Sequence, residues 1–183
     1  EGIFKRHGLD LPRSTLVGFV AQVAQVLEPI VLEVKRQVLQ SDYLQTDDTS
    51  VVILDPDVGD GRFKGHFWTY VDPLSGQVVF DVTPTRERDG PEQFLQDFRG
   101  YLQADAYGGY DQLYRGGLRV EVACWAHARR YFHESLESDQ RAAIILDLIQ
   151  KLYQVEKQAR DLAPEARLAL RREHAKPLLE QID

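Results

Sequence analysis

The stretch that decides the fold is SVVILDPDVGDGRFKGHFWTYVDPLSGQVVFDVT, residues 50–83. Three short runs in it are rich in the β-branched and aromatic residues that favour strands: Ser50–Leu54, His66–Val71 and Gln77–Thr83. Turns rich in Asp, Pro and Gly separate these runs, at Asp55–Gly61 and Asp72–Gly76. Strands joined by such short turns pair as antiparallel neighbours, so we expect a three-stranded antiparallel meander.

A helical pattern precedes the meander. Over residues 11–40, apolar side chains recur in steps of three and four, which predicts a helix with one apolar stripe. The stripe consists of Leu16, Val20, Val23, Leu27, Ile30, Val34 and Val38. Ser14 or Thr15 is the expected N-cap, and Pro29 predicts either a kink or the start of a second helix. We expect the stripe to pack against the core; a dimer zipper is the alternative.

Short elements follow the meander, and helices close the chain. Residues 91–98 predict a short helix, and residues 101–104 predict a buried strand that ends at Asp105. Glycine pairs at 108–109 and 116–117 bracket a small helix or turn. Residues 118–124 alternate apolar and polar side chains, as a half-buried strand does. From there on we expect helices at about 126–138, at about 139–161 and from Pro164.

This order, a meander followed by β-α-β units, is that of the ribonuclease-H-like fold, and many other α/β domains share parts of it. The sequence therefore predicts an α/β fold whose mixed sheet combines a three-strand antiparallel meander with parallel strands. N-terminal helices and a C-terminal all-helical insertion would flank this sheet. We expect a helical segment at 1–41, a partial ribonuclease-H-like catalytic core at 42–138 and a truncated helical insertion at 139–183.

Composition limits the class of protein but does not settle its partner. The chain has 183 residues, 43% of them hydrophobic, and a formal charge of −7, an unfavourable sign for binding phosphate. No apolar run approaches the roughly 20 residues that span a bilayer, and no secretory leader is present, so we expect no membrane partner. The single cysteine, Cys124, fits the reducing cytoplasm. Because the chain lacks methionine, we expect that Glu1 is not a natural start.

Two aspartates lie where a metal site would need them. Asp47 is at the head of the first predicted strand and Asp105 at the end of the fourth, and those strands are parallel neighbours in the predicted fold. Carboxylates that share two divalent cations can activate an attacking oxygen and stabilise the leaving oxygen of a phosphodiester. Spacing alone does not separate Asp47 from Asp48, although strand neighbours point to opposite faces. It also leaves open that these residues only begin a strand or end a turn.

A second group of candidates begins at the end of the last predicted strand. Cys124 and His127 have the look of a metal-ligand pair, but a structural zinc needs about four ligands and there is no other cysteine. We therefore expect no zinc, with Cys124 buried and His127 bonding in the first turn of the next helix. Arg129 and Arg130 form either a solvated face or a phosphate contact.

Three motifs occur in order along the chain: Thr46-Asp47-Asp48-Thr49, LQADAYGGY at 102–110 and ACWAHARRYF at 123–132. Together they resemble the insertion-sequence-66 transposase family, over essentially the whole chain. The resemblance implies that Asp47, rather than Asp48, and Asp105 are catalytic carboxylates of a two-metal site that holds Mg²⁺ or Mn²⁺. It also implies DNA partners, namely transposon ends and target DNA, and a homo-oligomer in the active complex. On this assignment Asp48 should point away from Asp105.

The chain departs from the family pattern in several places. Asp48 stands where the family has Glu, and Ala106 where it usually has Gly. Family members continue to an Asn-Asn-x-x-Glu-Arg motif, whose Glu is the expected third acid, and no such motif is found up to Asp183. The rival for this role is Glu134, on the predicted helix after residues 118–124. We therefore expect these residues alone to be catalytically incompetent.

Other functions remain open at this point. They are a metal-dependent nuclease or resolvase of the same fold, a non-catalytic DNA-binding or assembly module, and an acidic metal-binding α/β domain. Strand transfer would separate a transposase from a simple nuclease. Salt-dependent DNA binding would separate the last two.

Overall fold

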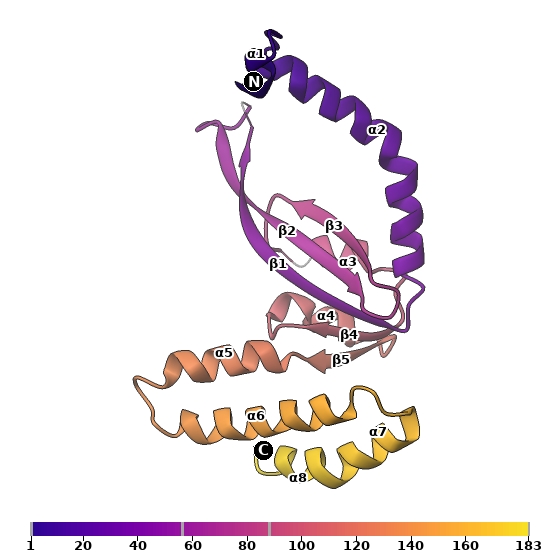
Figure 1. Ribbon diagram of the computed structural model, residues 1–183, viewed down its shortest axis with the longest axis vertical. Coiled ribbons are helices and arrows are strands. Elements are labelled where there is room, and N and C mark those ends of the chain that lie inside the picture. The colour runs from indigo at the N-terminus through magenta and orange to yellow at the C-terminus, as the bar shows by residue number, and fades with distance from the viewer. Residues whose placement is uncertain (1, 56, 88, 183) are drawn as a thin grey trace. The chain divides into compact units, whose positions relative to one another are not determined.

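Figure 1 shows a computed structural model of the chain, which describes residues 2–55, 57–87 and 89–182. Contacts divide the chain into two compact units, Glu1–Val122 and Ala123–Asp183. The first unit contains the sheet, and the second is helical. This division falls at the end of the last strand, whereas the predicted boundaries lie at 41 and 138. The predicted three-part organisation stays a prediction.

The first unit is built on one five-stranded sheet with the order β3-β2-β1-β4-β5. Its strands are β1 (Tyr43–Leu54), β2 (Arg62–Asp72), β3 (Gln77–Thr83), β4 (Gly100–Ala104) and β5 (Arg119–Ala123). The pairs β1–β2 and β2–β3 are antiparallel and β1–β4 is parallel, so the predicted meander and mixed sheet are confirmed. β1 begins at Tyr43 rather than Ser50 because its first residues pair with β4.

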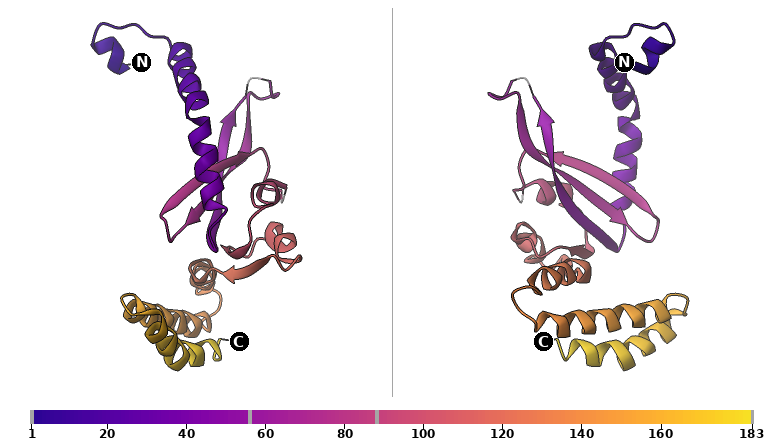
Figure 2. Two further views of the ribbon diagram at one scale, coloured as in Figure 1. Left: turned by 90° about the vertical axis from the view of Figure 1, so that its right-hand side faces the viewer. Right: turned by 60° about the vertical axis from the view of Figure 1, so that its left-hand side comes forward.

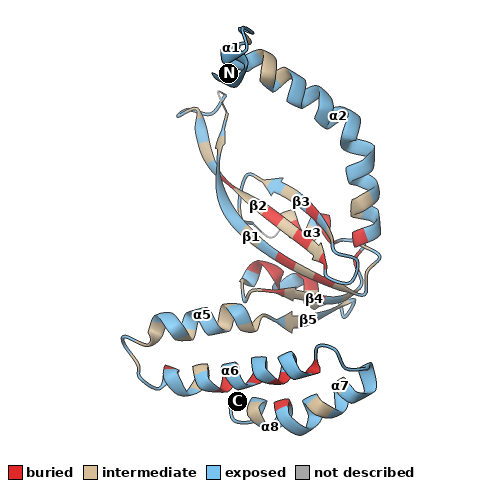
Figure 3. Ribbon diagram, in the orientation of Figure 1, coloured by how far each residue is buried: buried red, intermediate tan, exposed pale blue. Residues whose placement is uncertain are grey.

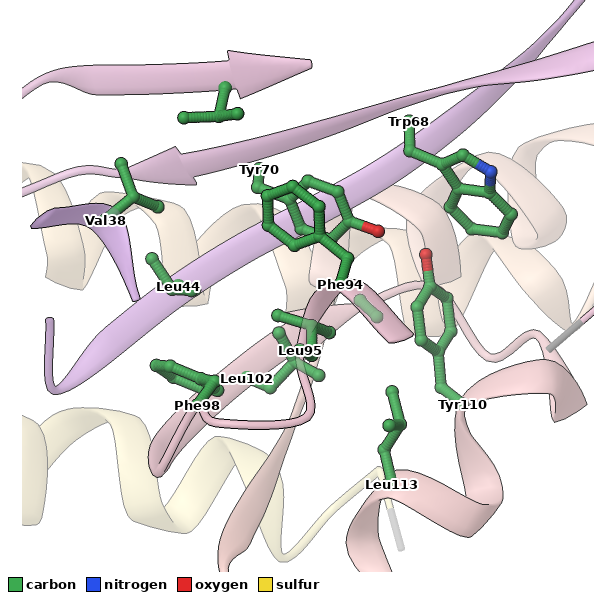
Figure 4. Close-up of a cluster of buried hydrophobic side chains, with 12 residues drawn as sticks. Val38, Leu44, Trp68, Tyr70, Phe94, Leu95, Phe98, Leu102, Tyr110 and Leu113 are labelled. Carbon is green, nitrogen blue, oxygen red and sulfur yellow. The ribbon is translucent and has the colours of Figure 1, made fainter. Parts of the chain in front are cut away.

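One face of this sheet carries the core. Leu44 and Thr46 of β1 are buried, whereas Asp47 between Thr46 and Asp48 is exposed. On the same face, the neighbouring strand β2 contributes the buried side chains of Trp68 and Tyr70 (Figure 4). Tyr70 stacks on Phe94 of α3 (Asp89–Phe94), with ring centroids 3.7 Å apart, and Trp68 meets Tyr110 edge-on at 6.1 Å. Aromatic pairs in such geometries stabilise a core beyond their buried area.

The segment between β4 and β5 covers that face. It contains a 3-10 turn, η1 (Gly108–Tyr110), and a short helix, α4 (Asp111–Tyr114), which buries Leu113. This agrees with the small helix expected between the two glycine pairs. Gly100 opens β4 with a φ of 138°, and a Cβ there would lie 2.5 Å from the carbonyl oxygen of Asp42. Only glycine fits this approach, which lets the Tyr101 N–H donate to the same carbonyl at 2.9 Å.

The N-terminal part consists of α1 (Gly2–Arg6) and the long helix α2 (Arg13–Val38). α2 runs as one helix through Pro29, and its N-cap is Pro12, so the expected caps Ser14 and Thr15 are wrong. The expectation that the apolar stripe packs against the core is correct only at the C-terminal end. There Val38 is buried and Val34 packs beside it, whereas the rest of α2 is mostly exposed (Figure 3).

The sequence expectation about apolar length is corrected by the same helix. Among the described residues, α2 is long and apolar enough to cross a membrane by length and composition, with a mean hydropathy of 1.7 over its most apolar window. Polar residues interrupt the apolar ones in α2, so the helix contains no long unbroken apolar run although its mean hydropathy is high. A single such helix near the N-terminus is weak evidence for a membrane span.

The second unit is a small helical hairpin assembly (Figure 2). Its helices are α5 (Trp125–Ser135), α6 (Ala142–Ala159), α7 (Pro164–Leu170), the π-helical turn η2 (Arg171–Ala175) and α8 (Lys176–Leu179). Leu152 and Val155 of α6 form a buried cluster with Ala175, and Arg171 pairs with Glu156 of α6 at 2.6 Å. The three predicted helical regions are confirmed, although α5 and α6 are shorter than expected.

Candidate active site

The guanidinium of Arg86 joins the carboxylates of Asp48 and Asp105. Its Nη2 lies 2.8 Å from Oδ1 of Asp48 and 3.3 Å from Oδ2 of Asp105, and its Nε donates to both Asp48 oxygens at 2.9 and 3.1 Å. The side chain of Asp48 is 3% exposed and that of Asp105 is 11% exposed. A carboxylate that is shielded from water is destabilised unless a cation or hydrogen-bond donor compensates its charge. Arg86 supplies this compensation for both aspartates.

Two further residues complete this network. Nδ1 of His66 lies 2.7 Å from Oδ2 of Asp48. The ring of Tyr107 lies 4.0 Å from the Arg86 guanidinium, and its hydroxyl donates to the Arg86 carbonyl. The Tyr107 N–H donates to Oδ1 of Asp105 at 3.2 Å. Burial lowers the pKa of Arg86, but the hydrogen bond and charge of Asp48 outweigh burial and raise it, so Arg86 stays charged.

Asp47 belongs to the other face of β1. It is exposed, and its Oδ1 accepts a hydrogen bond from the backbone N–H of Asp48 at 2.9 Å. The β1–β4 register pairs Gln45 with Gln103, and the Gln45 Nε2 donates to the Gln103 Oε1 at 2.8 Å on that face. Asp47 and Asp105 each come two residues later on their own chain segments. The ladder itself ends at Gln45 and Gln103, and the Asp105 carboxylate contacts Arg86 on the side of Asp48, so the structure does not bring Asp47 and Asp105 together.

The expectation that Asp48 points away from Asp105 is wrong. Leu44 and Thr46 face the core, and period two puts Asp48 on their side of β1. Asp105 follows the last residue of β4, where the ladder no longer fixes its side chain, so Arg86 can reach it together with Asp48. The two carboxylates thus share one guanidinium. The assignment of Asp47 and Asp105 as catalytic residues stays a prediction.

The electrostatics of this end of the sheet are negative. Burial, with smaller contributions from the charges of Glu121, Asp105 and Asp111, raises the pKa of the Tyr114 phenol to about 12. Burial also raises the pKa of Tyr110, to which the charges of Asp48 and Asp105 contribute. Arg86, which contacts both Asp48 and Asp105, compensates part of this negative charge.

Divalent metal ions fit part of this arrangement. Over residues 2–55, 57–87 and 89–182, no group of three or more His, Cys, Asp or Glu side chains is arranged to hold a metal ion. The carboxylates of Asp47 and Asp105 are nevertheless the hard oxygen ligands that Mg²⁺ and Mn²⁺ prefer. In the structure, however, Asp47 lies on the face of β1 opposite to Asp48, whereas Asp105 shares Arg86 with Asp48, so the two carboxylates are not arranged around one ion.

The other predicted site residues lie in the second unit. Cys124 precedes α5 and is partly exposed, so the expectation that it is buried is wrong. The His127 N–H donates to the Cys124 carbonyl at 3.1 Å, as expected for the first turn of this helix. Arg129 and Arg130 are exposed on α5, and the Arg130 guanidinium lies 5.5 Å from the Tyr131 ring. Both arginines are accessible to a phosphate.

Comparison with known families decides what kind of protein this is. The model for the Transposase IS66 family matches residues 1–183. The chain belongs to this family. The resemblance found in the three motifs is thereby confirmed, and the network around Arg86 lies in a member of this family.

Curated relatives of this transposase occur in Sinorhizobium fredii. The uncharacterized protein y4hP is 28% identical over 204 residues, which cover 98% of this chain and 36% of that protein. The uncharacterized protein y4jD is also 28% identical, over 98% of this chain and 38% of its own length. The transposase chain thus spans about a third of the length of the curated relatives that it matches.

One solved structure is similar to the transposase chain. It is the cryo-EM structure of a simian T-cell lymphotropic virus intasome in complex with the PP2A regulatory subunit B56 gamma. The TM-score is 0.36 at 14% identity, with 70% of this chain and 45% of that chain covered. At this TM-score the similarity carries no weight for the fold.

Sequence reasoning missed three residues of the transposase site: His66, Arg86 and Tyr107. The need for a cationic partner of Asp48 could have been inferred, although not which residue supplies it. Once β1 is known to start at Tyr43, Asp48 shares the face of Leu44 and Thr46, and a carboxylate there needs a cationic partner. Nothing in the periodicity, however, places Arg86, which lies in the loop after β3.

Proposed function

We propose that this transposase chain is part of a ribonuclease-H-like catalytic core that cleaves DNA and joins the freed end to target DNA with the aid of divalent metal ions. The observation that carries the proposal is the parallel pairing of β1 with β4, which makes the strand that bears Asp47 and Asp48 a neighbour of the strand that leads into Asp105; the choice of Asp47 as the ligand on β1 rests on the family resemblance. The strand order β3-β2-β1-β4-β5 supports the same fold, because the central strands then present both carboxylates at one end of the sheet.

In the proposed mechanism Asp47 and Asp105 hold Mg²⁺ or Mn²⁺ ions. The bound ions supply activation of an attacking oxygen and stabilisation of the leaving oxygen. Arg86 and the Tyr107 N–H hold the Asp105 carboxylate on the side of Asp48, so sharing an ion with Asp47 would require Asp105 to turn away from Arg86. Arg129 and Arg130 on α5 contact phosphates of the DNA backbone, as exposed guanidinium groups do.

The third acid is the open element of the site. We propose that it comes from sequence outside residues 1–183, in the motif that the family resemblance implies. Glu134 is the rival because it is exposed on α5, the helix that follows β5. The proposal further includes transposon ends and target DNA as partners, a homo-oligomeric active complex and a cytoplasmic location.

The test is cleavage of labelled transposon-end DNA with Mn²⁺, followed by transfer of the cut strand to target DNA. The assay compares this chain with one extended as in the longer relatives, each with Asp47→Asn, Asp105→Asn and, as the neighbouring control, Asp48→Asn. We expect cleavage and transfer in the extended chain and their loss with Asp47→Asn or Asp105→Asn. Cleavage that survives both substitutions would overturn the proposal, and activity of the short chain that disappears with Glu134→Gln would make Glu134 the third acid.

A further inference from the structure

The position of Arg86 is set by backbone contacts on both sides of the loop that carries it. The Thr83 hydroxyl, at the end of β3, donates to the Thr85 carbonyl at 2.7 Å and accepts the Trp68 Nε1–H at 2.7 Å. From the segment after β4, the Tyr107 hydroxyl donates to the Arg86 carbonyl. The loop is thus tied to the core on one side and to the neighbour of Asp105 on the other, and it brings the guanidinium to the end of the sheet.

The two carboxylates hold this guanidinium unequally. Nε of Arg86 donates to both oxygens of Asp48 at 2.9 and 3.1 Å, and Nη2 lies 2.8 Å from Oδ1 of Asp48. Asp105 receives one contact, from Nη2 to Oδ2 at 3.3 Å. A bidentate pair of this kind is stronger than a single longer bond. Asp48 is therefore the anchor of Arg86, and Asp105 is the partner that the guanidinium releases more easily.

Both oxygens of Asp105 are engaged by protein donors. Oδ2 accepts from Arg86, and Oδ1 accepts the Tyr107 N–H at 3.2 Å. A divalent cation binds carboxylate oxygens directly, at about 2.0–2.6 Å, so it competes with the guanidinium for the same carboxylate. The two cations also repel each other. This competition is the physical reason why the expected pair of Asp47 and Asp105 is not assembled in the structure.

We propose that the contact between Arg86 and Asp105 is autoinhibitory: it holds the Asp105 carboxylate on the side of Asp48 and so keeps the metal site incomplete. The inference rests on the proposed function, in which Asp105 is a metal ligand. When Asp105 turns away, Arg86 keeps its bidentate contact with Asp48, so the release costs one bond and leaves no unpaired guanidinium. Arg86 is a positioning residue that acts through Asp105 and lowers the affinity of the chain for metal.

General charge repulsion is the competing explanation, because a nearby guanidinium repels a divalent cation whether or not it holds Asp105. Tyr107→Phe separates the two explanations. It removes the hydroxyl that fixes the Arg86 carbonyl, but it changes no charge and retains both the ring beside the guanidinium and the N–H that Asp105 accepts. A loosened contact raises the affinity for metal in this variant, whereas general repulsion leaves the affinity unchanged.

The test is Mn²⁺ binding to the chain, measured by electron paramagnetic resonance of the free ion. We expect Arg86→Gln to bind Mn²⁺ about tenfold more tightly than the parent, through the loss of a competing charge. Tyr107→Phe should bind about threefold more tightly, as for the loss of one hydrogen bond. Arg86→Lys keeps the charge and should stay close to the parent. The matched control is Arg141→Gln, which removes a guanidinium from a solvent-exposed pair and should bind as the parent does.

Circular dichroism checks that each variant is folded at the temperature of the measurement. If Arg86→Gln does not fold, Tyr107→Phe decides alone. Unchanged Mn²⁺ affinity in Tyr107→Phe would overturn the proposal, and a rise in Arg86→Gln alone would assign the effect to general repulsion. A control that gains as much affinity as Arg86→Gln would overturn it as well.

Asp105→Asn, measured in the same series, separates this inference from the proposed function. If Asp105→Asn weakens Mn²⁺ binding but neither Arg86→Gln nor Tyr107→Phe strengthens it, the proposed metal ligand stands and the autoinhibitory contact is wrong. Unchanged binding in Asp105→Asn would instead remove Asp105 from the proposed metal site, and both proposals would then fail. None of these measurements depends on DNA cleavage.

Discussion

The Nη2 atom of Arg86 lies 3.3 Å from Oδ2 of Asp105, and it also lies 2.8 Å from Oδ1 of Asp48. The Arg86 guanidinium therefore neutralises two carboxylates that are distant in sequence, Asp48 in β1 and Asp105 just after β4. This guanidinium compensates Asp48, which is shielded from water, and leaves the second oxygen of Asp105 to the Tyr107 N–H. The carboxylate at the end of β4 is fixed by protein groups alone.

Replacing Arg86 with Gln should destabilise the fold. The Asp48 side chain, 3% exposed, would keep only His66 as a close partner, and removing one member of a shielded ion pair costs about 3 kcal/mol. Urea unfolding measures the change in the free energy of unfolding. Arg141→Gln is the control, because its pair with Asp139 is largely in solvent and is worth less than about 1 kcal/mol. Equal losses in the two variants would contradict the role of Arg86.

Mn²⁺ affinity should separate the two neighbouring aspartates. We expect Asp47→Asn and Asp105→Asn each to weaken Mn²⁺ binding about tenfold or more, because each removes an anionic oxygen ligand. Asp48→Asn should have a smaller effect, because the family resemblance assigns the ligand on β1 to Asp47 and because Asp48 keeps two partners, His66 and Arg86, beside it. Electron paramagnetic resonance of free Mn²⁺ measures all three. If Asp48→Asn alone abolished binding, Asp48 would be the ligand on β1.

Asp72 should make stability depend on pH. The Ser75 hydroxyl, 2.7 Å away, and the Leu74 N–H at 2.9 Å hold the pKa of this carboxyl below its usual value. Its contribution is therefore complete above the unfolded-state pKa of about 3.9 and is lost as the pH falls through the lower folded-state pKa. We expect Asp72→Ala to cost about 1–2 kcal/mol at pH 7.

The pH dependence is checked by urea unfolding of both proteins at about pH 7, above the unfolded-state pKa, and at about pH 3, below it. The difference between parent and Asp72→Ala should shrink at the lower pH. A difference that is unchanged between the two conditions would show that the turn is held by other contacts.

Gly100→Ala should weaken the start of β4. The backbone there has a φ of 138°, and the new Cβ would lie 2.5 Å from the Asp42 carbonyl oxygen, so we expect a loss of about 2–3 kcal/mol. Gly18→Ala is the control, since no atom lies within 4 Å of a Cβ in that position and alanine favours helix. Thermal unfolding compares the two. A Gly100 variant as stable as the parent would mean that the strand start can shift.

The meander and the parallel fourth strand were predictable because turn residues and strand-forming runs mark their ends in the sequence itself. The same holds for Asp105, which ends such a run. That Asp48 points to the core side of β1 was not predicted, because the start of the strand at Tyr43 was missed. Which residues of a strand point to which face depends on how the strand pairs with its neighbours. The exposure of α2 could not be predicted, since a core stripe and a dimer seam have the same spacing.

The hairpin of β1 and β2 has a consequence for solubility. Pairing of β1 with β4 ends at Gln45 and Gln103, so in the described part of the chain Thr49–Leu54 has a strand neighbour only in β2. An open edge of this kind can template the addition of a strand from another molecule. The carboxylates of Asp55, Asp57 and Asp60 lie at the tip of this ribbon and repel those of any identical ribbon that approaches. Acidification that neutralises them, or salt that screens them, removes this protection, and aggregation would then begin at the ribbon.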